Sequence, residues 1–165
     1  MSMKTTLVAA VVSASVTLLP LTTSGAATMQ EANAKTFAEL VDVVFNHGSI
    51  DAADKYFQPS LVDHAPWPGQ TADVAGFKAG LAEMRKSFPD FHVTVERTVA
   101  EKDMLVVHAK FSGSQLGEFM GAKPSGKTFN VEAIDIVRMS DGRIAEHWGL
   151  IDAAAMAEQL GLGAN

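Results

Sequence analysis

Residues 129–151 read FNVEAIDIVRMSDGRIAEHWGLI, and they give the clearest indication of the fold. Apolar and polar side chains alternate through residues 129–139 and again through 143–151, which is the period of a β-strand with one buried face. Asp141-Gly142 stands between the two runs, and this dipeptide between alternating segments is a strong signal for a β-hairpin. The stretch therefore predicts two antiparallel strands joined by a tight turn.

Two registers are compatible with this hairpin. A two-residue turn sets Asp135 opposite Trp148, whereas a three-residue loop with Gly142 in the left-handed conformation sets Asp135 opposite His147. A slip of one residue moves every side chain of a strand to the other face, so the register determines which residues lie together. We favour the three-residue loop because it groups the small apolar side chains of both strands on the face that carries Asp135 and His147.

The periodicity changes on the N-terminal side of the hairpin. Further alternation predicts strands over residues 91–99 and 104–112. Apolar residues at the spacing of one helix face, with capping and terminating residues, predict helices over residues 30–46, 51–57, 71–88 and 152–160. The remaining long segments are expected to be a connector at residues 60–69 and a loop at residues 113–127. This order is typical of an α+β domain, in which N-terminal helices pack on a curved, mainly antiparallel sheet of four to six strands.

Composition narrows the possible chemistry. The 165 residues carry a net charge of −6, so the chain lacks the basic surplus that nucleic-acid binding needs. The sequence has no cysteine, which excludes disulfides, thiolate metal sites and cysteine nucleophiles. The five histidines do not have the spacing of a metal site, and the glycines do not form a phosphate-binding motif. We therefore expect neither a metal nor a cofactor.

The first 27 residues have the organisation of a secretory signal peptide. Lys4 precedes an apolar segment at residues 7–21, and the small residues that follow end in Ala26-Ala27, which suits signal peptidase. The apolar segment is shorter than the ~20 residues of a spanning helix, although an uncleaved membrane anchor is the alternative. We expect residues 1–27 to be removed and residues 28–165 to form one periplasmic or secreted domain with no membrane contact.

Several short motifs occur in the order of a known family. They are Tyr56-Phe-Gln-Pro59, Val62-Asp-His64, Phe88-Pro-Asp90, Gly117-Glu-Phe-Met-Gly121, Pro124-Ser-Gly-Lys127, Ser140-Asp-Gly-Arg-Ile-Ala-Glu-His-Trp148 and Gln159-Leu-Gly161. On these motifs the chain resembles the SnoaL-like family, the polyketide-cyclase or ester-cyclase branch of the nuclear-transport-factor-like, cone-shaped α+β superfamily. The resemblance implies a cone with an apolar internal pocket, and ring closure by intramolecular aldol condensation in which an aspartate acts as acid and base without a cofactor.

The resemblance also implies roles for residues of the last two strands. It places the family's aspartate one residue after Trp148, where this chain has Gly149, and it matches a pocket histidine to His147. A partner on the preceding strand falls on Asp135. A carboxylate on an apolar face must be paired or protonated, and an aspartate–histidine pair can move a proton next to a carbonyl group. We expect Asp135 and His147 to be catalytic, and a buried pair with a purely structural role is the alternative.

Three further residues are expected to bind a substrate. His64 lies on the connector that would cross the pocket mouth, the proline-flanked Trp67 follows it, and Phe119 lies in the long loop. The alternatives are a surface histidine, an aromatic cap on the core and a loop anchor. Asp152 is expected to cap the last helix, with a role as a pocket acid as the alternative.

The outer face of the sheet is expected to be apolar. Under the favoured register it carries Ile134, Ile136, Ile144, Trp148 and Leu150. A patch of this kind predicts a homodimer through that face. Two functions remain open: a cofactor-free cyclase, isomerase or dehydratase acting on a small hydrophobic carbonyl or ring compound, and a non-catalytic small-molecule binding protein that has lost the cyclase acid at Gly149.

Overall fold

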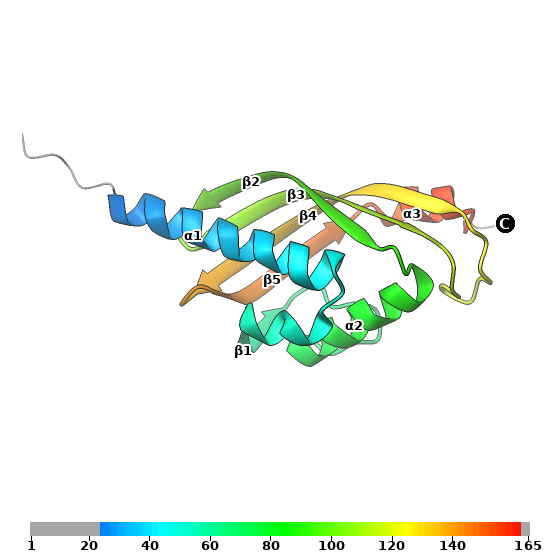
Figure 1. Ribbon diagram of the computed structural model, residues 1–165, viewed down its shortest axis with the longest axis horizontal. Coiled ribbons are helices and arrows are strands. Elements are labelled where there is room, and N and C mark those ends of the chain that lie inside the picture. The colour runs from blue at the N-terminus through cyan, green and yellow to red at the C-terminus, as the bar shows by residue number, and fades with distance from the viewer. Residues whose placement is uncertain (1–23, 163–165) are drawn as a thin grey trace, which may run out of the picture.

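The computed structural model describes residues 24–162 and confirms the α+β class (Figure 1). In chain order the elements are α1 (Ser24–Leu40), the π-helix η1 (Val41–Asn46), the 3₁₀ helix η2 (Ile50–Lys55), β1 (Phe57–Asp63), α2 (Val74–Ser87), β2 (His92–Glu101), β3 (Met104–Ser114), β4 (Thr128–Ser140), β5 (Arg143–Ile151) and α3 (Ala153–Leu160). The expected helices and strands are all found. β5 has the predicted bounds, the others have shifted ends, the helix expected at 30–46 continues from α1 into η1, and β1 is an addition.

The five strands form one open, mixed sheet in the order β1-β5-β4-β3-β2. The strands β2 to β5 pair antiparallel with their sequence neighbours, whereas β1 runs parallel to β5 at one edge. In Figure 1 the helix α1 crosses one face of this sheet, which we call the inner face, and α2 lies on the same side. The sheet and these helices enclose the core.

Tight packing between the helices and the inner face holds the core together. Val44 of η1, Leu81 of α2 and Val107 of β3 are completely buried. Phe88 and Phe129 are also buried, and their rings meet edge to face at 5.0 Å. Burying one such side chain stabilises the fold by roughly 2 kcal/mol or more.

The helices α2 and α3 both begin at an aspartate cap. The side chain of Asp73 accepts a hydrogen bond from the Gly76 backbone N–H at 2.8 Å at the start of α2. The side chain of Asp152 accepts one from the Ala155 backbone N–H at 2.9 Å at the start of α3, which confirms the capping role expected for it. Such a bond satisfies a backbone donor that the helix itself leaves without a partner.

The hairpin between β4 and β5 differs from the favoured register. Ser140 pairs with Arg143 across a two-residue turn in which both central residues are left-handed, with φ of 49° at Asp141 and 73° at Gly142. Such a turn matches the twist of the strands. The prediction of a three-residue loop was therefore wrong. The pairing then shifts by one residue, because Ala145 is extra in β5 and forms a β-bulge.

The bulge restores the predicted faces with different cross-strand partners. Asp135 lies opposite Gly149 and Val137 lies opposite His147, so Asp135 and His147 are diagonal neighbours on the inner face rather than a direct pair. Ile144 precedes the bulge and is therefore 1% exposed on the inner face. Its expected place on the outer face was wrong for this reason.

The connector expected at residues 60–69 begins as a strand. β1 extends to Asp63, and Asp63 pairs with His147 of β5. Within β1, Leu61 and Asp63 are buried while Val62 is exposed, which is the alternation of a strand with one inner face. Pro59 is tolerated because β1 is an edge strand with a neighbour on one side only.

The expected signal peptide lies largely outside the described residues. Residues 1–23 are not described, and residues 24–27, around the expected cleavage site, belong to α1. Among the described residues, none of the helices is both long and apolar enough to cross a membrane.

Candidate active site

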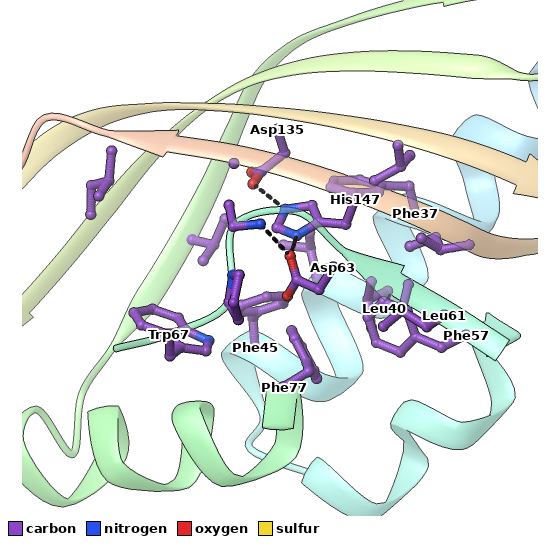
Figure 2. A pocket seen from close by; sticks show the side chains of 18 of the residues that line it. Phe37, Leu40, Phe45, Phe57, Leu61, Asp63, Trp67, Phe77, Asp135 and His147 are labelled. Atoms are coloured by element: carbon purple, nitrogen blue, oxygen red, sulfur yellow. Dashed lines mark hydrogen bonds and ion pairs between the residues drawn. The ribbon is translucent and has the colours of Figure 1, made fainter. Parts of the chain in front are cut away.

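A small apolar cavity lies between the inner face of the sheet and the helices (Figure 2). Its volume is about 210 Å³. The apolar part of its lining comes from every layer of the fold and includes Phe37, Leu40, Phe45, Phe57, Leu61, Trp67, Phe77, Val93, Phe111, Val137 and Ile144. Three ionisable side chains, those of Asp63, Asp135 and His147, interrupt this apolar surface. We call them the Asp–His–Asp group.

The His147 ring lies between the two carboxylates. Its Nδ1 is 2.8 Å from Oδ1 of Asp63, and its Nε2 is 3.1 Å from Oδ1 of Asp135. Figure 2 shows the three side chains in line, with β4 and β5 on one side of the ring and β1 on the other. Because a carboxylate accepts, both contacts are satisfied when both ring nitrogens carry hydrogen, as in the imidazolium form.

Strong interactions oppose the effect of burial on the histidine. Burial disfavours the charged ring, but the hydrogen bonds and negative charges of Asp135 and Asp63 outweigh it and raise the pKa of His147 from 6.5 to about 9. Burial also tends to raise the pKa of Asp63. The hydrogen bonds from His147 and from the Ala65 backbone N–H, with the nearby charge of His147, nevertheless hold the pKa of that carboxyl below its ordinary value of 3.8.

The two carboxylates differ in their access to the cavity. The Asp63 side chain is 4% exposed, whereas the Asp135 side chain is 16% exposed and the His147 side chain 22% exposed. Oδ1 of Asp63 also accepts from the Ala65 backbone N–H at 2.9 Å, which fixes the carboxylate from behind. Asp63 therefore orients the ring, and Asp135 and Nε2 of His147 are the groups that a molecule in the cavity can meet.

Gly149 supplies the space in which the group is arranged. A Cβ atom at this position would lie 3.1 Å from Nε2 of His147 and 3.4 Å from Oδ1 of Asp135. The Asp135 carboxylate thus reaches from β4 to the place where a side chain of residue 149 on β5 would begin. The acid that the resemblance expects one residue after Trp148 is matched in space by a carboxylate from the neighbouring strand.

Of the predicted site residues, Asp135, His147 and Trp67 line this cavity and the other two do not. The His64 ring lies on the opposite, outer face, where it stacks on Trp148 at 4.5 Å and contacts Glu146 at 3.2 Å. It was expected at the pocket mouth, and that placement was wrong because β1 continues to Asp63 and alternation turns the next side chain outward. Phe119 packs edge to face on Phe88 at 4.9 Å and lines a different cavity near α3.

Sequence reasoning missed Asp63 as a member of the site. It directly precedes His64, which was predicted to bind a substrate. The strand that turns the Asp63 side chain inward was not predicted. The sequence of β1, FQPSLVD, does not alternate apolar and polar side chains, so periodicity gave no signal for it. Within residues 24–162 there is no cluster of three or more potential ligands arranged to hold a metal ion.

The fold and the site together define an α+β domain with an open, mixed sheet and an ionisable group set in an apolar cavity. A family model described as SnoaL-like polyketide cyclase matches residues 35–160. The chain therefore belongs to the SnoaL-like polyketide cyclase family.

Relatives support this assignment in sequence and in structure. The nogalonic acid methyl ester cyclase of Streptomyces nogalater is 25% identical over 119 residues, which are 71% of this chain and 89% of that protein. The structure of TsrD from Streptomyces laurentii has a TM-score of 0.72 and 26% identity, and the match covers 80% of this chain and 96% of that chain. IdmH from Streptomyces antibioticus has a TM-score of 0.71 and 30% identity, with 78% and 98% covered.

Proposed function

We propose that this protein is a cofactor-free acid–base enzyme that removes a proton next to a carbonyl group of a small hydrophobic compound, as a cyclase or an isomerase does. The observation that carries the proposal is the Asp–His–Asp group. Asp135 and His147 of this group border a cavity that is otherwise lined by apolar side chains. The cyclase activity named for the Streptomyces nogalater relative supports the same chemistry.

In the proposed reaction Asp135 is the base and His147 is the acid. The Asp135 carboxylate takes a proton from the carbon next to a carbonyl group. Protonation weakens its hold on the Nε2–H of His147, which then hydrogen-bonds to the enolate oxygen that forms. In a cyclase the enolate carbon then forms a bond with a second carbonyl carbon of the same molecule, whose oxygen receives the proton. In an isomerase the proton returns to another carbon. Asp63 is a positioning residue, because it holds Nδ1 and keeps the ring charged.

The non-catalytic alternative has less support. It depends on the loss of the family's acid at Gly149, yet Oδ1 of Asp135 lies 3.4 Å from where a Cβ of residue 149 would be. Keeping two carboxylates beside an apolar cavity is costly unless they are paired, and one carboxylate would be enough to satisfy a structural histidine. A binding protein for apolar molecules needs neither.

Proton exchange tests the proposal without knowledge of the natural substrate. The probe is 2-tetralone in deuterated buffer, and NMR follows the loss of the protons next to its carbonyl group. We expect the protein to accelerate exchange, and Asp135→Asn and His147→Gln to reduce the acceleration by about 10²–10⁴-fold, the usual contribution of general acid–base catalysis. His64→Gln, a histidine on the outer face, is the matched control and should leave the rate unchanged. Equal rates for the wild type and His147→Gln would refute the assignment.

A relocation experiment tests the role of the carboxylate more directly. Asp135→Ala should abolish the acceleration, and adding Gly149→Asp to it should restore part of the rate, because the new carboxylate begins in the space that Asp135 now reaches. Asp135→Ala combined with Gly149→Asn is the control, because it adds a side chain of the same size at residue 149 without the carboxylate. If the Asp135→Ala, Gly149→Asp protein folds and shows no recovery, position rather than charge is decisive and the equivalence proposed here is wrong.

We also propose that two copies associate through the outer face of the sheet. Apolar side chains there remain accessible, with exposures of 46% for Val62, 59% for Val99, 39% for Val106 and 77% for Leu150. Pairing through this face would remove them from water. The Trp148–His64 stack lies on the same face and would be covered with them.

Export remains a proposal that rests on the sequence of residues 1–27. Mass spectrometry of the native protein tests it, because cleavage after Ala26 or Ala27 predicts a chain that begins at Ala27 or Thr28. A native chain that retains Met1 or Met3 would contradict cleavage.

A further inference from the structure

The cavity of the candidate active site ends at an aromatic wall. Trp67, Pro68 and Ile151 line this cavity, and they also line the separate cavity near α3. The indole of Trp67 is the largest of these three side chains. Figure 2 shows it across the active-site cavity from Phe57 and Leu61. Trp67 therefore sets how far the active-site cavity extends in this direction.

Two glycines of α2 allow this wall to approach the helix closely. A Cβ atom on Gly80 would lie 2.1 Å from Cδ1, 2.3 Å from Cγ and 2.7 Å from Cβ of Trp67. One turn earlier on the same face, a Cβ atom on Gly76 would lie 1.9 Å from the backbone oxygen of Thr71. These distances are far below a van der Waals contact of about 3.5–4.0 Å. The segment that carries the indole lies against α2 only because both residues lack a side chain.

The loop of residues 64–72, which carries Trp67, is also fixed by its own backbone. The Asp63 backbone N–H donates to the Ala72 oxygen at 3.1 Å, and this bond closes the loop at its base. The Gln70 backbone N–H donates to the Trp67 oxygen at 2.9 Å. Proline precedes and follows Trp67 and restricts the backbone there. Together with the contact to α2, these constraints hold the indole in one place.

The volume of the closed cavity indicates the size of its ligand. Ligand pockets usually measure about 300–1,000 Å³, and the active-site cavity, at about 210 Å³, lies below that range. An apolar cavity of about 150 Å³ takes up benzene. The active-site cavity therefore has room for one substituted ring or two fused rings. A longer molecule would have to displace the indole from Gly80.

We propose that Trp67 is the specificity-determining residue of this site, and that it limits the substrate to a compact carbonyl compound of one or two rings. Only the carbonyl group in this description rests on the proposed function. The size limit follows from the cavity and from the contact of the indole with α2, so binding rather than turnover tests it.

Two ketones that differ by one ring measure the size limit. 1-Tetralone has two fused rings, and 3,4-dihydro-2H-phenanthren-1-one is the same ketone with a third fused ring. Isothermal titration calorimetry gives the Kd of each. The third ring adds apolar surface, so a site without a wall would bind the three-ring ketone more tightly. We expect the wild type instead to bind 1-tetralone at least about tenfold more tightly, because extra atoms forced into a packed space are costly.

Trp67→Ala should remove this preference. Without the indole the two cavities join, and the affinity for the three-ring ketone should rise by at least about tenfold relative to that for 1-tetralone. Trp148→Ala removes the chain's other tryptophan from the outer face, and this matched control should keep the wild-type preference. If Trp67→Ala fails to fold by circular dichroism, Trp67→Leu shortens the wall instead, and a smaller change in the same direction is expected.

Urea unfolding tests the contact between the indole and α2. In the wild type, Gly80→Ala should lower the unfolding midpoint, because the new methyl group meets the side chain of Trp67. In the Trp67→Ala background the same substitution should leave the midpoint unchanged or raise it, since alanine favours a helix more than glycine does. A purely additive effect of the two substitutions would show that α2 does not hold the indole.

Three results would overturn the size limit. The first is a wild type that does not bind 1-tetralone more tightly than the three-ring ketone. The second is a ratio of the two affinities that a folded Trp67 variant leaves unchanged, or that Trp148→Ala changes equally. The third is additivity of Gly80→Ala and Trp67→Ala. None of these measurements follows proton exchange, so failure of the size limit is distinguishable from failure of the proposed chemistry, for which the exchange rate in His147→Gln is decisive.

Discussion

Removing the proton from the His147 ring by raising the pH should destabilise the folded protein. The pKa of His147 is about 9 in the folded chain, against an ordinary value of 6.5 that applies once the chain unfolds. One pKa unit corresponds to about 1.4 kcal/mol, so the charged ring contributes roughly 3 kcal/mol to the free energy of unfolding. Because the folded pKa is the higher one, this contribution is complete below pH 6.5 and is lost as the pH rises through about 9.

Urea unfolding at several pH values measures this loss. The wild type and His147→Gln are compared in steps between about pH 6 and pH 10, since the variant lacks the titrating group and isolates its contribution. The difference between the two free energies should shrink by about 1.4 kcal/mol per pH unit between the two pKa values. His92→Gln, which removes an exposed histidine from β2, is the control and should follow the wild type.

One result would contradict a charged His147 ring. If the wild type and His147→Gln lose stability in parallel between pH 6.5 and 9, the ring is not charged in that range and the two carboxylates do not act on it as the distances imply. The same titration predicts activity: with His147 as the acid, the exchange rate should fall as the pH rises through about 9. A rate that rises there would make the neutral ring the base instead.

Three further predictions concern other parts of the molecule. Asp63→Asn should lower the pKa of His147 in an NMR titration and remove a stabilising contribution that the wild type loses as the pH falls below about 3.8; an unchanged titration would contradict its positioning role. Asp73→Ala should cost about 1 kcal/mol in urea unfolding by removing the cap of α2, and a change of only a few tenths would count against it. Val106→Glu should convert the proposed dimer into a monomer in light scattering, whereas an unchanged dimer mass would exclude this face.

Four of the five strands could be predicted from sequence because they largely alternate. Residues 104–112 and 129–139 place apolar side chains at every second position, with Asp135 as the exception, and the structure has both strands. The faces of Asp135 and His147 followed from the same pattern. Their cross-strand partners could not be predicted in the same way. The bulge at Ala145 shifts the register set by the turn at Asp141-Gly142, and alternation alone does not reveal a bulge.

The third member of the site was harder to predict for a different reason. Asp63 belongs to an edge strand that contains Pro59 and pairs in parallel with the last strand of the sheet. A parallel partner leaves no turn signal in the sequence, and proline normally argues against a strand. The cavity near α3 could not be predicted either, because it is formed by α2, α3 and a loop that meet only in the folded chain.

The parallel pairing of β1 with β5 also affects the order in which the parts of the protein fold. Asp63 and His147 are separated by 84 positions along the chain. Contacts between distant segments form slowly, because the loop between them must first be closed. β1 can therefore pair only once β5 is available. A nascent chain without residues 143–151 would hold Asp63 with neither its ring partner nor its neighbouring strand. The Asp–His–Asp group is therefore completed late in folding, once residues 143–151 are in place.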